Sequence, residues 1–376
     1  MPQPEPTARI IRGDCLKAPF PYFGGKSRCA DLIWQRFGAV RNYVEPFAGS
    51  LAVLLSRPEP WAGTETVNDA DGFISNFWRA TAADPEAVAH AADWPVNEND
   101  LHARHAWLVG QRDSLQARLE GDPTWFDAKI AGWWCWGICC WIGSGWCSGK
   151  GPWQVVDGAL IDSRKLVHLG DAGQGVNRKL VHLGNAGQDE ERGPGCEPQA
   201  GGGISRKRPL ITNDSVGVAN KSDIYSWFAA LSARLARVRV CCGDWTRVCG
   251  PTPTVKQGLT AVFLDPPYAA AAKRDSDLYR IDCEQVANAV RDWAVEHGDD
   301  PRMRICLAGY EGEHRMPKRW AVVPWKAKGG YASQSLKHDN LNAARERLWF
   351  SPHCVKPTIA RRRIKAAQQA AAVAVA

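Results

Sequence analysis

The sequence of 376 residues predicts an α/β fold, in which a doubly wound sheet is interrupted in mid-chain by a helical, loop-rich insertion. Short apolar strands alternate with turns and helices near both ends of the chain, which is the repeat of such a sheet. Between these parts the periodicity becomes helical and then gives way to a glycine-rich stretch. The length fits one large domain with an insertion, or two modest domains.

The first part of the predicted sheet lies within residues 19–82. Tyr43–Glu45 has the pattern of a short buried strand, and a glycine turn and an apolar helix over Leu51–Leu55 follow it. Thr66–Val67 predicts a second strand, which a further helix follows. Strand, glycine turn, helix and strand form the repeating unit of a doubly wound sheet.

Residues 83–220 form the predicted insertion. Its first stretch is helical and polar, and a Trp-rich block follows from Trp125 to Trp153. Because large aromatic side chains beside Ile and Cys are usually buried, most of this block should pack in a core, although some rings could line a pocket. The stretch within 148–210 is expected to be a mobile, loop-rich surface insertion, and its near-duplicate over 164–188 has no assigned role.

The second part of the predicted sheet covers residues 221–352. Its four predicted strands are short apolar runs: Val238–Cys242, Ala261–Leu264, Met303–Leu307 and Leu348–Phe350. Two helices should alternate with them, one before the first strand and one around Val286–Val295. Residues 353–376 form a basic, alanine-rich tail that should be frayed.

Composition restricts the class of protein. Hydrophobic residues make up 45% and charged residues 23%, a balance that excludes a wholly disordered chain. Lysine and arginine exceed aspartate and glutamate by 47 − 40 = 7, which permits a polyanionic partner without requiring one. No stretch reaches the ~20 apolar residues of a membrane span, and no signal peptide is recognisable. A soluble, cytoplasmic protein is therefore expected.

The 13 cysteines do not have the spacing of a common metal site. None occurs in Cys-x-x-Cys, and the closest group, Cys135 to Cys147, fits no common zinc pattern. Reduced, mostly buried thiols and no metal are therefore expected.

The strongest chemical signal is Asp-Pro-Pro-Tyr at Asp265–Tyr268, directly after a predicted buried strand. The two prolines make the backbone rigid and fix the Asp265 carboxylate and the Pro266 carbonyl at the carboxyl edge of the sheet. An exocyclic amine could donate one hydrogen to each of these acceptors, and Tyr268 offers a flat face for an unstacked base. The alternative is a strand followed by a proline turn with an ordinary capping aspartate.

A second signal, Phe20–Lys26, precedes the first strand. Its paired glycines let the backbone approach a ligand closely, Tyr22 can cover a ring or an alkyl chain, and Lys26 can hold a carboxylate. The alternative is a turn with a solvated lysine.

A third signal is the first strand-to-helix turn, Glu45–Gly49, where an adenosyl cofactor normally lies in such sheets. It lacks the further glycines of a dinucleotide fingerprint. Asp69 follows Gly49 by 69 − 49 = 20 residues, the spacing at which an acidic side chain accepts hydrogen bonds from ribose hydroxyls. The alternative for Asp69 is a helix N-cap.

In their order along the chain, these motifs resemble the Dam-like alpha group of S-adenosyl-L-methionine-dependent DNA adenine-N6 methyltransferases, which includes many phage-borne enzymes. The motifs are Phe-x-x-Phe-Gly-Gly-Lys, Tyr-Val-Glu-Pro-Phe-Ala-Gly, Asn-Asp-x-Asp and Asp-Pro-Pro-Tyr. The resemblance covers about residues 19–80 and 221–352. It implies a Rossmann-like methyltransferase core, with the middle of the chain as the target-recognition region.

Matched position by position, the resemblance implies roles for individual residues. The implied cofactor-binding residues are Tyr22, Lys26, Glu45, Phe47, Gly49, Asp69, Asp244 and Asp265. The implied catalytic residues are Asp265, Pro266 and Tyr268. Asp69 would bind the ribose of S-adenosyl-L-methionine, Asp244 would lie near its adenine, Asp265 would hold the target amine, and Tyr268 would stack on the flipped base. The sequence departs from the family at Ser50–Leu51, where many members have a further glycine-containing turn.

The expected function is site-specific methylation of adenine N6 in double-stranded DNA, by base flipping and direct in-line transfer. The alternatives are a cytosine-N4 or RNA methyltransferase of the same fold, and a catalytically silent DNA-binding relative. Cytosine-N4 enzymes usually begin the fourth motif with serine. A monomer in a bacterial or phage-infected cell is favoured. The sequence leaves open whether the enzyme has a partner nuclease in a restriction–modification system.

Three basic runs suit contacts with DNA phosphates, and each could instead be a solvated face. They are Ser205–Arg208, Arg234–Arg247 and Arg361–Lys365.

Overall fold

The computed structural model describes residues 16–22, 24–58, 63–141, 146–147, 153–156, 159–162, 216–267, 277–325 and 345–356. In the stretches 153–156, 159–162, 216–223 and 277–284 it describes the backbone alone. The duplicate over 164–188 and all of the predicted tail beyond residue 356 lie outside the described residues.

Helices and strands alternate along both outer parts of the chain. The helices are α1 (Ala30–Phe37), α2 (Ala52–Leu55), α3 (Gly72–Ala83), α4 (Pro85–Ala92), α5 (Glu98–Gly121), α6 (Ala128–Cys140), α7 (Val216–Leu235) and α8 (Asp277–His297). The strands are β1 (Asn42–Glu45), β2 (Thr64–Asp69), β3 (Trp153–Val156), β4 (Ala159–Asp162), β5 (Val238–Cys242), β6 (Thr260–Leu264), β7 (Met303–Tyr310), β8 (Ala321–Pro324) and β9 (Glu346–Phe350). The six strands that the apolar runs predict are confirmed.

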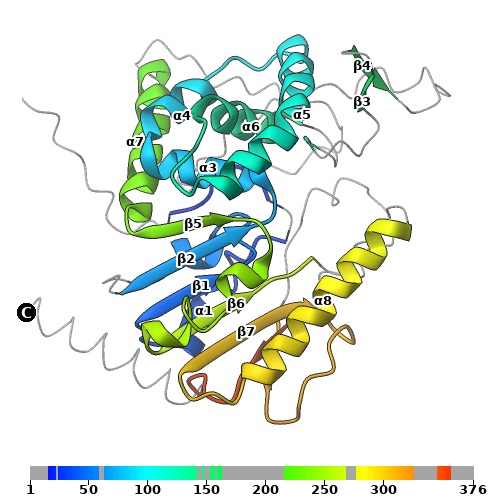
Figure 1. Cartoon of the computed structure of the whole chain (residues 1–376). Coiled ribbons are helices and arrows are strands. Elements are labelled where there is room, and N and C mark those ends of the chain that lie inside the picture. The colour runs from blue at the N-terminus through cyan, green and yellow to red at the C-terminus, as the bar shows by residue number, and fades with distance from the viewer. Residues whose placement is uncertain are drawn as a thin grey trace, which may run out of the picture.

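Seven of these strands form one sheet in the order β5–β2–β1–β6–β7–β9–β8 (Figure 1). The first five run parallel, and β9 runs antiparallel between β7 and β8. The chain moves outward from β1 in one direction through β2 and β5, and in the other through β6 and β7. Open α/β sheets bind ligands at such a reversal, beyond the carboxyl ends of the strands. This mixed α/β architecture confirms the predicted fold class and is consistent with a Rossmann-like methyltransferase core.

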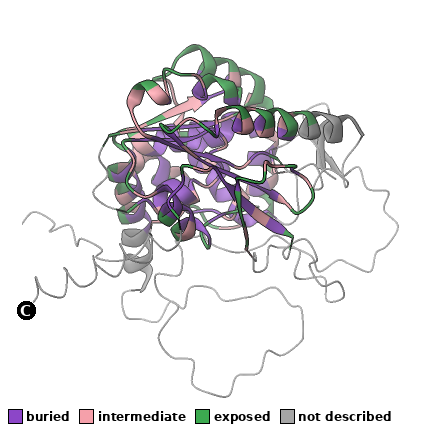
Figure 2. Ribbon diagram, turned by 90° about the horizontal axis from the view of Figure 1, so that it is seen from below, coloured by how far each residue is buried: buried purple, intermediate pink, exposed green. Residues whose placement is uncertain are grey.

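Alternate side chains of the central strands enter two cores, one on each face of the sheet. Tyr43 and Phe263 belong to one core, to which side chains of α1, α2, α3, α6 and α7 also contribute, whereas Val44 and Val262 belong to a second core with side chains of α8 and of the short turn at Trp245–Val248. This alternation follows from the two-residue period of a strand. Figure 2 shows the burial that results: the sheet is largely buried, and the outward surface of α8 is exposed.

Helices α3 to α7 pack together beyond the β5 edge of the sheet (Figure 1). Helix α6 approaches α4 closely, since a methyl group added at Gly132 would lie 2.4 Å from the Cβ atom of Ala91. Trp134 and Trp136 on α6 are buried, as the sequence predicts for most of the Trp-rich block. Helix α7 packs against α3 and α4 and begins before residue 221, where the sequence analysis places the return to the sheet.

Three strands escape sequence prediction. Strands β3 and β4 form a two-stranded antiparallel sheet within the stretch predicted to be loop-rich. Strand β8, with the sequence Ala-Val-Val-Pro, is apolar, but it is only four residues long, ends in proline and lies at the edge of the sheet with mostly exposed side chains. Within the described ranges, no helix is both long enough and apolar enough to cross a membrane.

A buried ion cluster joins β2 to the helices. Glu65 on β2 accepts hydrogen bonds from Arg57 at 2.7 Å and from two nitrogens of Arg234 on α7 at 2.7 and 2.8 Å. All three residues are no more than 7% exposed. The hypothesis that Arg234 contacts DNA phosphates is therefore wrong, because its guanidinium is enclosed and paired inside the fold.

Candidate functional site

Asp265 lies directly after β6, at the carboxyl edge of the sheet. Its Oδ2 atom is 2.8 Å from the Nζ atom of Lys26, which also donates a hydrogen bond to the Gly24 carbonyl at 2.7 Å. A second carboxylate, Glu346 at the start of β9, lies 3.9 Å from the same ammonium. The Lys26 side chain is only 3% exposed and that of Asp265 is 21% exposed, so Asp265 is the accessible member of the pair.

The charges at this edge affect the ionisation of Lys26 and of Glu346. Burial by itself would lower the pKa of Lys26, but the carboxylates of Asp265 and Glu346 outweigh this effect and raise it. Burial raises the pKa of Glu346 to about 7, with Lys26 opposing the shift and Asp265 adding to it. At neutral pH Lys26 is therefore charged, and Glu346 is near the midpoint of its titration.

Asp69, at the end of β2, holds the turn that follows β1. Its two carboxylate oxygens accept hydrogen bonds from the backbone N–H groups of Gly49 and Asp71, both at 2.9 Å. Burial and the neighbouring Asp71 raise the pKa of Asp69 to about 7, although the side chain is only half-buried. The N-cap of α3 is Asp71, which accepts from the N–H of Phe73, so the alternative of a helix cap at Asp69 is wrong.

Tyr22 covers this turn. A methyl group added at Gly49 would lie 2.5 Å from the ring atom Cε1 of Tyr22, and Gly49 has a φ of 46°, in the region that favours glycine. The Tyr22 side chain remains 40% exposed. Leu51, where the sequence departs from the family pattern, also has a positive φ, of 51°, which costs about 1–2 kcal/mol for such a residue.

Asp244 follows β5, next to the end of β2. It is exposed and accepts a hydrogen bond from the N–H of Thr246. Asn68 donates hydrogen bonds to the carbonyls of Pro46 and Gly243 and so connects the turns after β1 and β5. Phe47, in the turn after β1, is half-buried and stacks on Trp245 with ring centroids 6.3 Å apart. The strand ends of β1, β2 and β5 therefore present two carboxylates and a flat apolar face.

Glu45, like Lys26, is almost fully enclosed, since it is only 2% exposed. Its Oε2 atom accepts a hydrogen bond from the hydroxyl of Tyr43 at 2.9 Å, and burial raises its pKa to about 8. It lies beneath the strand edge.

The structure thus brings together Lys26 with Asp265, and Tyr22 with Gly49 and Asp69. Tyr268 lies outside the described residues. Sequence reasoning missed Glu346, because only the direction of β9 places its first residue at this edge.

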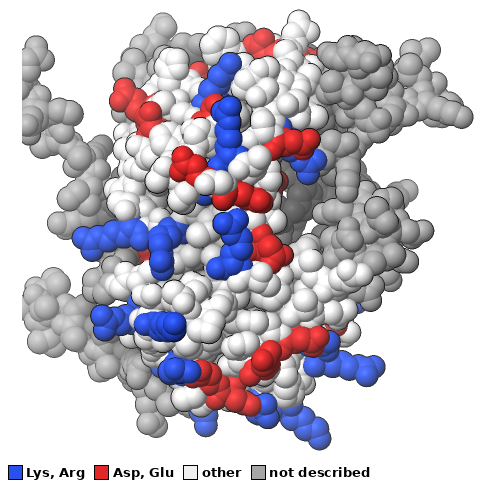
Figure 3. Space-filling model, viewed as in Figure 1, with Lys and Arg blue, Asp and Glu red and all other residues white. Residues whose placement is uncertain are grey.

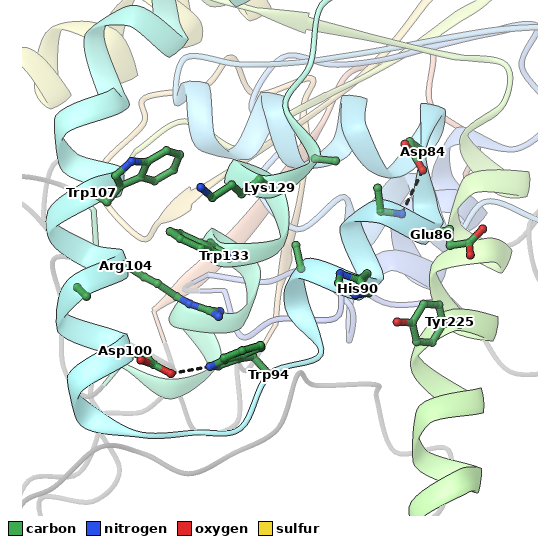
Figure 4. A pocket seen from close by; sticks show the side chains of 14 residues that line it. Asp84, Glu86, His90, Trp94, Asp100, Arg104, Trp107, Lys129, Trp133 and Tyr225 are labelled. Atoms are coloured by element: carbon green, nitrogen blue, oxygen red, sulfur yellow. Dashed lines mark hydrogen bonds between the residues drawn. The ribbon is translucent and has the colours of Figure 1, made fainter.

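A separate groove of about 1010 Å³ lies among α4, α5, α6 and α7 (Figure 4). The guanidinium carbon of Arg104 lies 4.4, 4.7 and 5.0 Å from the ring centroids of Trp136, Trp133 and Trp94. Lys129 lies 4.4 Å from the ring centroid of Trp133. Cation–π contacts of this kind stabilise a charge that has lost water. Part of the Trp-rich block therefore lines a pocket, while most of it is core.

Charges on the face seen in Figure 3 are mixed, with Lys and Arg side chains interspersed among Asp and Glu. Among the described residues, no group of three or more His, Cys, Asp or Glu side chains is arranged to hold a metal ion. The ten cysteines whose side chains are described are free thiols, and nine of them are buried, in agreement with the sequence prediction.

Comparison with known proteins supports one class of enzyme. A family model of the D12 class N6 adenine-specific DNA methyltransferases matches residues 22–109, which carry Tyr22, Lys26, the Gly49 turn and Asp69. The comparison with curated proteins gave no match. Together with the seven-stranded, mostly parallel sheet, the family match supports an enzyme that is an adenine-specific DNA methyltransferase.

Proposed function

We propose that this chain transfers a methyl group from S-adenosyl-L-methionine to adenine N6 at specific sites in duplex DNA, by base flipping and in-line displacement. The observation that carries this proposal is the partly exposed Asp265 carboxylate, paired with buried Lys26 at the carboxyl edge of the sheet. Adenine and DNA are supported by the family match. We place the enzyme in the Dam-like group on the order of its four motifs.

The side chains at this edge fit the proposed cofactor. Each oxygen of Asp69 accepts one backbone hydrogen bond and retains a lone pair that suits a ribose hydroxyl. Asp244 supplies a second exposed acceptor, and Phe47 supplies a flat face for a purine ring. Tyr22 would cover the bound molecule from above the Gly49 turn. When bound, S-adenosyl-L-methionine supplies a methyl group activated by a positively charged sulfur.

Asp265 would perform the central steps on the target base. Its carboxylate and the Pro266 carbonyl would accept the two hydrogens of the N6 amine, which concentrates the nitrogen lone pair for attack on the methyl carbon. The N–C bond forms as the S–C bond breaks, with its electron pair staying on sulfur. Asp265 would then accept the proton that the methylated nitrogen loses. Tyr268 is proposed to stack on the flipped base.

We also propose which parts of the chain form the methyltransferase core and which part recognises the target sequence. Residues 19–82 and 221–352 would form the methyltransferase core, and the insertion over 83–220 would contribute target recognition. Helix α7 (Val216–Leu235) would span the boundary between the two parts, because it packs on α3 of the core and on α4 of the insertion.

The direct test is a transfer assay. Purified protein is incubated with methyl-labelled S-adenosyl-L-methionine and unmethylated duplex DNA, and the DNA is digested to nucleosides. Label in N6-methyldeoxyadenosine is expected. Label in N4-methyldeoxycytidine would correct the base, label transferred only to RNA would correct the substrate, and cofactor binding without transfer would indicate a silent relative.

Gly49→Ala is expected to weaken cofactor binding about tenfold or more while the fold is retained. The new methyl group would meet the Tyr22 ring and force Tyr22 away from the turn, and the positive φ adds about 1 kcal/mol of strain. Calorimetric titration with S-adenosyl-L-methionine measures the change. Gly110→Ala on α5 is a matched control because a methyl group there has no neighbour within 4 Å. Equal affinities for both variants would contradict the role of the turn.

A further inference from the structure

Glu346 reaches the site because of the direction of its strand. Strand β9 pairs antiparallel with β7, and its first residue lies opposite Tyr310, the last residue of β7. The amino end of β9 therefore lies at the same edge as the carboxyl end of β6, where Asp265 follows. The backbone of Glu346 is fixed there, since its carbonyl accepts a hydrogen bond from the N–H of Trp325 at 3.2 Å.

The side chain of Glu346 is enclosed but incompletely partnered. The residue is 5% exposed, and its Oε2 atom makes no hydrogen bond with any described residue. Among the described residues, this atom forms an ion pair with the Lys26 ammonium at 3.9 Å, and that ammonium lies 2.8 Å from Asp265. A buried carboxylate with so few partners costs free energy of folding. Stability alone therefore does not explain a glutamate at this position.

Lys26 has opposite effects on Asp265. The ion pair holds the Asp265 carboxylate in place, but a full positive charge at 2.8 Å also weakens that carboxylate as an acceptor for any other group. A second carboxylate beside the ammonium offsets part of this charge. With Glu346 ionised, the three side chains sum to one negative charge, and with Glu346 neutral they sum to zero.

We propose that Glu346 is a positioning residue for methyl transfer: it shares the Lys26 ammonium, so that Asp265 stays fixed by the ion pair yet remains a strong acceptor for the target amine. This inference rests on the proposed function of Asp265.

Several titratable and charged groups surround Glu346. They are Lys26 before α1, Cys29 at the start of α1, Asp265 after β6, and Tyr310 and Arg345 beside β9. Because burial and Asp265 raise the pKa of Glu346 to about 7, its charge changes within an accessible pH range. The transfer rate should therefore rise as Glu346 ionises.

The test compares kcat of the wild type and Glu346→Gln between pH 5.5 and 8.5. Above about pH 8, the glutamine variant should be at least tenfold slower. Below about pH 6 the two rates should converge, since Glu346 is then neutral in the wild type. The ratio of the two kcat values isolates the effect of Glu346, because groups that titrate in both proteins, such as Asp69, affect both rates equally. Cofactor affinity by calorimetry and KM for DNA should change less than about threefold.

Two further variants complete the design. Glu346→Asp keeps the charge and should recover part of the rate and its rise with pH. Glu311→Gln removes an exposed glutamate that pairs with Arg347 on the same strand, and it should behave as the wild type. A rate ratio that is constant across pH, or a Glu346→Gln enzyme with the wild-type rate, would overturn the inference. If the wild type itself transfers no label to adenine N6, the proposed function fails instead.

Discussion

Asp265→Ala is expected to lower kcat for transfer to adenine N6 by about a thousandfold or more. The change removes the partly exposed carboxylate that lies at the end of β6. Losing one preorganised electrostatic contact typically costs about 10²–10³ in kcat, and Asp265 would contribute both a hydrogen-bond acceptor and a proton acceptor. Single-turnover transfer of labelled methyl measures the effect.

Asp265→Asn separates the two contributions. It keeps an acceptor oxygen and removes the charge, so its rate should lie between those of the wild type and Asp265→Ala. Lys26 keeps Glu346 as a partner in both variants, so the fold should survive. Asp292→Asn on α8 is the matched control, because that side chain is 68% exposed and lies on another surface. A wild-type rate for Asp265→Ala would refute the mechanism.

Glu65→Gln is expected to lower the free energy of unfolding by about 3–5 kcal/mol. The substitution removes the carboxylate with which the buried guanidinium groups of Arg57 and Arg234 both pair. Urea unfolding followed by tryptophan fluorescence and circular dichroism measures the loss.

Two further variants test whether the loss of unfolding free energy comes from burying charge. Glu311→Gln breaks an exposed pair and should change the free energy of unfolding by less than about 1 kcal/mol. The triple variant Arg57→Met, Glu65→Leu, Arg234→Met removes all three charges at similar volume and should regain much of the stability. A loss below about 1 kcal/mol for Glu65→Gln would show that the cluster is solvated in solution.

The sheet could be predicted because its strands carry a signal of their own. Runs such as Ala261–Leu264 are apolar throughout, and both faces of that strand are indeed covered. Strand β8 is also apolar, but it ends in proline, its side chains mostly face solvent, and it pairs only with β9 at the edge of the sheet. A short apolar run that ends in proline does not by itself predict a strand, because proline cannot donate a hydrogen bond to a neighbouring strand.

The site could be predicted where function depends on a short motif, and not where it depends on topology. Asp265 and Lys26 were selected separately, and the fold places them 2.8 Å apart. Glu346 gave no signal, since a glutamate at the start of a strand is ordinary. Its role depends on β9 running antiparallel to β7, and this pairing joins residues that are 346 − 310 = 36 or more positions apart in the chain. Arg234 is the opposite case. It lies in a basic run that suits contacts with DNA phosphates, but its guanidinium is buried and donates a hydrogen bond to Glu65.

The position of β1 in the middle of the sheet has a consequence for protein synthesis. Asn42 on β1 hydrogen-bonds Thr260 on β6, 218 residues later in the chain. At about 5–20 residues per second, a ribosome needs on the order of 10 to 40 seconds to supply that partner. During this interval one edge of β1 has no strand to pair with, whereas α3 to α6 already have all their mutual contacts. The helices can therefore pack while the chain is growing, and the sheet must close late, when a nascent chain most needs protection from aggregation.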